Sequence, residues 1–177
     1  MTDPVRYAFE TFWRVRAEPG DVWDVLYDVP SYPHWWPQVR EVGELSGETE
    51  TYDVLVRSVL PYDLRFRLSQ RVADRATGIL EAGLHGDLEG FSRWSIRPAR
   101  AGAILRFEEE VVTTRRLFNV LAPVARPAFV GNHWWMMRSG EIGLQTFMSG
   151  YRFGRQGPIG KHQQVARARA KRAQRAR

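Results

Sequence analysis

The alternation of apolar and charged side chains between residues 64 and 113 constrains the fold more than any other feature. Successive side chains of a β-strand point to opposite faces of a sheet, so three stretches are predicted to be strands. Their predicted inward residues are Leu64, Phe66, Leu68, Gln70 and Val72; then Leu88, Gly90, Ser92, Trp94 and Ile96; then Leu105, Phe107, Glu109, Val111 and Thr113. The opposite face is mostly charged, which indicates an antiparallel sheet with one face toward solvent.

The flanking segments predict what covers the apolar face. Residues 5–16 alternate like a further strand, a short helix follows Pro19, and three prolines exclude a long helix across 28–38. Turn residues divide 38–115 into antiparallel strands. Apolar residues recur at helical spacing over 128–148, and the predicted buried side of this helix is Val130, His133, Trp134, Met137, Gly140, Leu144, Phe147 and Met148. The predicted fold class is α+β, with a long C-terminal helix held against a bent antiparallel sheet.

Length and composition set the domain organisation. A chain of 177 residues suits one domain, predicted over 1–153, and the glycines after Phe153 begin a flexible linker and basic tail over 154–177. The absence of cysteine excludes disulfides, thiolate catalysis and cysteine-based zinc sites. The sequence has no apolar run of 18 residues and no recognisable secretory signal, so a soluble cytoplasmic protein is expected.

The net charge of +6 is concentrated in the tail. Residues 161–177 hold seven cations and no acid, and without them 19 basic residues face 20 acidic ones. Such a tail is a solvated terminus, or it contacts the phosphates of an anionic membrane or a nucleic acid as an adaptor. With no aromatic residues among the tail cations, base-specific nucleic-acid binding is not expected.

Several segments together resemble a known family. The run Asn132-His133-Trp134-Trp135-Met136-Met137-Arg138-Ser139-Gly140-Glu141-Ile142-Gly143-Leu144 resembles the terminal-helix pattern N-H-x-x-x-M-x-x-G-x-x-G-L of bacterial START-like (SRPBCC) proteins. Further similar segments are Val22-Trp23-Asp24-Val25-Leu26, Trp35-Trp36-Pro37, Leu60-Pro61-Tyr62-Asp63-Leu64, and Gly86-Asp87-Leu88-Glu89-Gly90 with Arg93-Trp94. These proteins form the polyketide cyclase/dehydrase and lipid-transport group. The resemblance covers about residues 5–150 and implies a helix-grip fold with a chamber for a hydrophobic small molecule.

Two polar residues of the predicted inward faces are candidates for chemistry. Alternation places Glu109 between Phe107 and Val111, where a carboxylate facing an apolar chamber could act as a general acid or base. His133 lies on the helix face expected to meet the chamber, and an imidazole there could orient a ligand or relay a proton. Both also have structural readings, in which Glu109 reaches the chamber mouth or pairs with an arginine or His133, and His133 packs beside Trp36 or Trp94. No spacing of ligand residues suggests a metal, and no motif suggests a cofactor.

The sequence therefore predicts a binding protein for a hydrophobic small molecule, either aromatic, polyketide-like or acyl. The predicted ligand-binding residues, besides Glu109 and His133, are Trp36, Phe66, Gln70, Ser92, Trp94, Phe107 and Met137. Trp36 is expected to form part of a lid over the chamber. Whether the protein carries its ligand or transforms it stays open. An enzyme of this kind would be a cyclase, aromatase or dehydratase that needs no cofactor.

Overall fold

The computed structural model describes residues 6–45, 50–57, 63–113 and 116–152. Its elements, in chain order, are β1 (Arg6–Val15), α1 (Pro19–Tyr27), the 3-10 helix η1 (Val29–His34), β2 (Val39–Glu44), β3 (Thr51–Arg57), β4 (Asp63–Asp74), β5 (Ile79–Gly86), β6 (Leu88–Ala99), β7 (Gly102–Thr113) and α2 (Arg116–Arg152). The predicted basic tail over 154–177 lies outside the described residues. Pro19 begins α1, as its fixed backbone angle favours.

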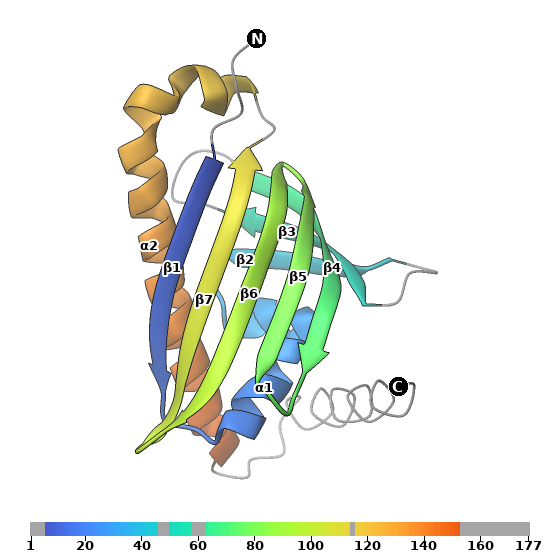
Figure 1. Cartoon of the computed structure of the whole chain (residues 1–177), viewed down its shortest axis with the longest axis vertical. Helices are drawn as coiled ribbons and strands as arrows, with labels where there is room; N and C mark the ends of the chain where they lie inside the picture. Colours follow the sequence, from blue (N-terminus) through green and yellow to red (C-terminus); the bar gives the residue numbers. More distant parts are fainter. Residues whose placement is uncertain (1–5, 46–49, 58–62, 114–115, 153–177) are drawn as a thin grey trace.

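The strands form one antiparallel sheet in the order β1-β7-β6-β5-β4-β3-β2. Strands β2 to β7 follow one another as a meander, whereas β1 pairs with β7, so the first and last strands of the chain are neighbours. In Figure 1 the sheet faces the viewer, α2 runs along β1, and α1 lies behind the lower end of the sheet. The predicted helix-grip architecture is confirmed.

A β-bulge in β4 changes one predicted face. Gln70 pairs with Ala82, but Val72 pairs with Glu81, so Arg71 is the extra residue. Beyond the bulge the alternation is inverted, and Ala73, opposite the buried Leu80, packs on the core in place of Val72. The prediction that Val72 faces inward is therefore wrong, because one inserted residue moves every later side chain to the other face.

Helix α2 is anchored to the segment after η1 through two glycines. A Cβ at Gly143 would overlap the carbonyl oxygen of Trp35, and a Cβ at Gly140 would lie 2.7 Å from Cε2 of Trp36. The indole N–H of Trp36 donates a hydrogen bond to the carbonyl oxygen of Met136 at 3.1 Å. The two glycines thus allow a close approach, and this approach fixes how far α2 stands from the sheet.

The helix differs from its prediction in two respects. It begins at Arg116 rather than near Pro127, and Figure 1 shows that its first part bends away from the axis of the rest. Prolines at 123 and 127 fall in that part, and proline is the usual cause of a helix kink. Val130 and Trp134, predicted to be buried, are exposed. Each precedes an inward residue, His133 or Met137, by three positions, so helical spacing alone did not separate the edge of the inward stripe from its centre.

Candidate functional site

A cavity of about 180 Å³ lies between the sheet and α2. Its walls come from every strand of the sheet and from α1, η1 and α2, and the side chains that line them are mainly aliphatic and aromatic. For scale, a dry cavity of about 150 Å³ is enough to bind benzene. The chamber predicted from the sequence is therefore present and has room for at least one aromatic ring.

Aromatic side chains in mutual contact build one side of the cavity. The ring of Trp94 lies 4.6 Å from Phe107 and 4.7 Å from Trp13, measured between centroids, and Trp13 lies 5.5 Å from Trp36. Trp13 is completely buried behind this wall, whereas Trp36, Trp94 and Phe107 line the cavity itself. Tilted and edge-on arrangements of this kind are the favourable ones for aromatic rings, so these contacts stabilise the wall.

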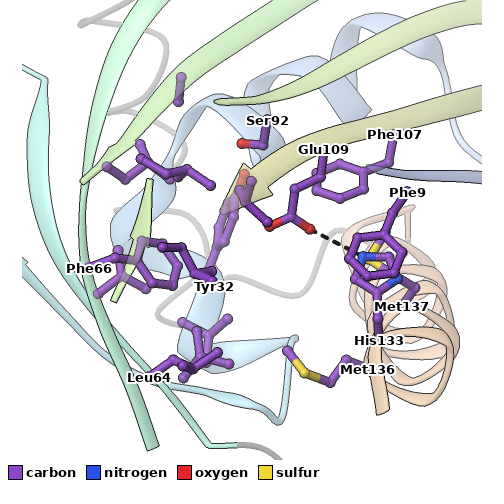
Figure 2. A pocket seen from close by; sticks show the side chains of 18 of the residues that line it. Phe9, Tyr32, Leu64, Phe66, Ser92, Phe107, Glu109, His133, Met136 and Met137 are labelled. Atoms are coloured by element: carbon purple, nitrogen blue, oxygen red, sulfur yellow. Dashed lines mark hydrogen bonds and ion pairs between the residues drawn. The ribbon is translucent and has the colours of Figure 1, made fainter. Parts of the chain in front are cut away.

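Glu109 and His133 form a polar pair at the cavity wall. Nε2 of His133 lies 3.2 Å from Oε2 of Glu109, so an imidazole N–H there can donate to the carboxylate. The side chains are only 15% and 12% exposed for His133 and Glu109. In Figure 2 Glu109 reaches from β7 toward α2, and Phe9 lies against His133. The two rings are nearly parallel, with centroids 3.8 Å apart, so Phe9 fixes the plane of the imidazole.

The pairing of Glu109 with His133 matches one of the two structural readings of Glu109. His133 stacks on Phe9, however, rather than packing beside Trp36 or Trp94 as its own structural reading had it. An ion pair or a hydrogen bond between the two is compatible with a structural or a chemical role. What the geometry adds is that a carboxylate and an imidazole share a hydrogen bond beside an apolar cavity.

Two further polar side chains line the cavity. Ser92 is the cross-strand partner of Glu109, so its hydroxyl lies on the same face of the sheet. Gln70 donates its amide N–H to the carbonyl oxygen of Val72 at 3.0 Å, within the β4 bulge. Ser92 is therefore better placed than Gln70 to offer a hydrogen bond to a guest.

All nine residues predicted from the sequence line this one cavity. Six of them are labelled in Figure 2, where Phe66 and Leu64 of β4 lie across the space from His133 and Met136 of α2. Trp35 is buried but does not line it, and Trp134 is exposed, so neither belongs to the wall. Whether Trp36 acts as a lid stays a prediction.

Sequence reasoning missed several lining residues. Phe9 follows Tyr7 on the inward face of β1, and alternation could have identified both as part of the site. Met136 follows His133 by three residues and Asn132 by four, and this helical spacing is the signal for the α2 wall. Tyr32 comes from η1, where no periodicity exists, and burial raises the pKa of its hydroxyl, which donates to the carbonyl oxygen of Leu26 at 2.7 Å.

Over residues 6–45, 50–57, 63–113 and 116–152, no group of three or more His, Asp or Glu side chains could hold a metal ion. Within the same ranges, no helix has the length and apolar character needed to cross a membrane.

Comparison with known proteins adds a family match. The family model described as polyketide cyclase / dehydrase and lipid transport matches residues 15–130. This range contains six strands, α1, η1 and the start of α2, and it supplies most of the cavity wall. No curated protein matches the sequence.

Solved structures share the fold at low sequence identity. The Zhui aromatase/cyclase from Streptomyces sp. R1128 is similar with a TM-score of 0.66 and 16% identity, over 80% of this chain and 93% of that one. A protein from Thermus thermophilus gives a TM-score of 0.61 and 12% identity, over 80% and 98%. Norcoclaurine synthase from Thalictrum flavum, with a transition-state analogue, gives 0.55 and 11%, over 84% and 99%. Identities this low establish the shared fold and nothing about the ligand.

Proposed function

Because the chain belongs to the polyketide cyclase/dehydrase and lipid transport family, we propose that it binds a hydrophobic small molecule in the cavity between the sheet and α2. The observation that carries this proposal is an apolar cavity with a single carboxylate–imidazole pair on its wall. Apolar walls supply affinity by removing the guest from water, and a few placed polar groups select its orientation. An aromatic, polyketide-like or acyl compound fits this description.

A substitution that places a large side chain of β6 inside the cavity tests the binding proposal. Ser92 faces inward and Ser95 lies on the opposite face of β6, so Ser92→Phe and Ser95→Phe make the same change on two sides of the sheet. Native mass spectrometry of freshly purified protein identifies any co-purified guest, and tryptophan fluorescence titrations with polyketide, sterol and acyl compounds measure binding. We expect Ser92→Phe to weaken binding at least about tenfold and Ser95→Phe to leave it unchanged. No binding by the wild type across the panel, or equal effects of both variants, would contradict the proposal.

A second candidate function is acid–base catalysis on the bound molecule, and the Glu109–His133 pair favours it. In a dehydration, the Glu109 carboxylate would accept a proton from the carbon beside a carbonyl group. The imidazolium of His133 would donate a proton to the departing hydroxyl, and a carbon–carbon double bond would form as water leaves. This step needs no oxidant or reductant. The similar solved structures described as aromatase/cyclases are enzymes with the same fold. This supports a catalytic role for the present protein without identifying its substrate.

Glu109→Gln separates binding from catalysis. The amide keeps the size of the carboxylate but cannot accept the proton, so dehydration of an aromatic β-hydroxy ketone should fall about 10²-fold or more, while its binding changes little. Glu110→Gln, on the outer face of the same strand, is the matched control and should keep full turnover. Equal turnover by Glu109→Gln and the wild type would eliminate Glu109 as the catalytic group.

A further inference from the structure

The charged side chains of the cavity wall are acidic. Among the described residues that line the cavity, two are acids, Glu81 and Glu109, and none is an arginine or a lysine. Glu81 is already paired, because its Oε2 accepts the guanidinium of Arg93 at 2.6 Å. Glu109 is paired with His133 instead. An anion bound in this cavity would therefore meet no guanidinium or ammonium group that offsets the loss of its hydration.

The carboxylate of Glu109 has one oxygen in use and one to spare. Its Oε2 lies 3.2 Å from Nε2 of His133. Within the part of the chain that the structure describes, no hydrogen bond or ion pair engages Oε1. Oε1 is not one of the fully buried polar atoms either, so it is accessible from the cavity. In the ionised carboxylate this oxygen accepts hydrogen bonds and cannot donate one.

Ser92 places a hydroxyl beside this oxygen. It is the cross-strand partner of Glu109, and the Cβ atoms of such partners lie about 4.5–5.5 Å apart. Figure 2 shows both side chains on the cavity side of the sheet. Over the described ranges, no hydrogen bond engages the hydroxyl of Ser92. A hydroxyl group on a guest can therefore donate to Glu109 and accept from Ser92, which satisfies it in both directions.

The strands on the other side of the cavity give the guest a direction. The side chains that they contribute to the wall include Val54 and Val56 of β3 and Leu64, Phe66 and Leu68 of β4. These are all apolar. A guest with a hydroxyl at one end and hydrocarbon at the other is thus accommodated with its hydrocarbon end toward β3 and β4.

We propose, in an inference that rests on the proposed function, that Glu109 makes the cavity selective for neutral hydroxyl compounds and against free carboxylates. A substituted phenol represents the favoured class. A carboxylate guest would bring its negative charge next to that of Glu109, and it has no donor for Oε1. An ammonium group brings three donors, one more than the two acceptors can satisfy. Fatty acids and aromatic acids are therefore excluded from the acyl and aromatic compounds that bind.

Three para-substituted benzenes of similar size test the proposal on the full chain. They are 4-propylphenol, 4-propylanisole, which keeps the oxygen but lacks the donor, and 4-propylbenzoate. Isothermal titration calorimetry measures their dissociation constants. We expect the phenol to bind at least about tenfold more tightly than either of the others, since a hydrogen bond to a charged acceptor is worth at least that factor. Ser92→Phe, which fills the cavity, should remove the binding of the phenol and so locate it.

Glu109→Gln removes the charge and keeps an acceptor oxygen. We expect this variant to bind the phenol within about threefold of the wild type and the benzoate at least about tenfold more tightly than the wild type does. Glu110→Gln, on the outer face of the same strand, is the matched control and should keep the wild-type preference. The preference compares two guests on one variant, so it does not depend on how stable that variant is.

The outcomes separate this inference from the proposed function. Equal binding of the phenol and the benzoate by the wild type, or tighter binding of the benzoate, would overturn the selectivity and leave the cavity a binding site. An unchanged preference in Glu109→Gln would also overturn it. If none of the three guests binds while larger polyketide, sterol or acyl compounds do, the inference fails alone. If no compound binds, both fail.

Discussion

The position of Glu109 in β7 determines which face of the sheet its side chain points to. Its neighbours Glu108 and Glu110 are on the outer face of β7, near Arg106 and Arg6, whereas Glu109 turns inward to His133. Alternation alone predicted this, because β7 has no bulge in its pairing with β1 or β6. The partner could not be predicted in the same way, since it depends on how α2 is placed over the sheet.

Glu89 gives a pH-dependent prediction at the residue scale. The backbone N–H of Gly86, followed by His85, holds the pKa of the Glu89 carboxyl below its ordinary value near 4.5. The folded protein therefore favours the ionised form, and this contribution to stability is fully present above about pH 4.5 and lost as the pH falls through the folded pKa. We expect the free energies of unfolding of the wild type and Glu89→Gln to converge below pH 4.5. Urea unfolding between pH 3 and 7 checks this, and a constant difference down to pH 3 would contradict it.

At the scale of elements, contact between α2 and the segment after η1 decides where the cavity lies. The carbonyl of Trp35 occupies the space where a side chain of residue 143 would be, so only glycine allows this spacing. Residue 131 lies in the same helix with open space around it. The same substitution at residues 131 and 143 therefore distinguishes two effects. At residue 131 it changes only helix propensity, and at residue 143 it also changes the packing of α2.

Gly143→Ala is expected to lower the free energy of unfolding by about 3 kcal/mol, because the new methyl group forces α2 away from Trp35. Gly131→Ala, the control, is expected to raise it by about 0.5–1 kcal/mol, since alanine favours an exposed helix. Urea titrations followed by circular dichroism measure both. A Gly143→Ala protein as stable as Gly131→Ala would show that the close approach does not limit the packing.

Elements also show where sequence reasoning stops. The α+β order, the inward strand faces and the two helix glycines were predictable, because each follows from a local rule of spacing or propensity. The bulge at Arg71 was not, since nothing in the alternation of β4 distinguishes an inserted residue. Trp134 was placed on the wrong side because aromatic residues usually signal the core, and a surface tryptophan has the same sequence pattern.

At the scale of the molecule, Trp13 connects the parts that must fold together. It is completely buried, and it contacts Trp36 after η1 and Trp94 of β6. A Cβ added to Gly140 of α2 would lie 2.9 Å from its ring, so the helix packs on it as well. The sheet, the 3-10 segment and the helix thus share one side chain.

Trp13→Ala is therefore expected to cost about 3–5 kcal/mol and to lower the unfolding midpoint of every element together. Trp134→Ala, at an exposed position, should change stability by no more than about 0.5 kcal/mol. Far-ultraviolet circular dichroism and intrinsic fluorescence, recorded on the same urea series, test this. Separate transitions by the two probes would show that helix and sheet are not coupled through Trp13.

The pairing of β1 with β7 has a consequence for biosynthesis. Arg6 pairs with Val112, more than a hundred residues later, so β1 leaves the ribosome long before its partner exists. Translation proceeds at about 5–20 residues per second, so on the order of 5–20 s pass before β7 is synthesised. During this time Trp13 and the other apolar side chains of β1 are exposed to water. Nascent-chain stability should therefore depend on chaperone shielding of the first strand until translation passes residue 113.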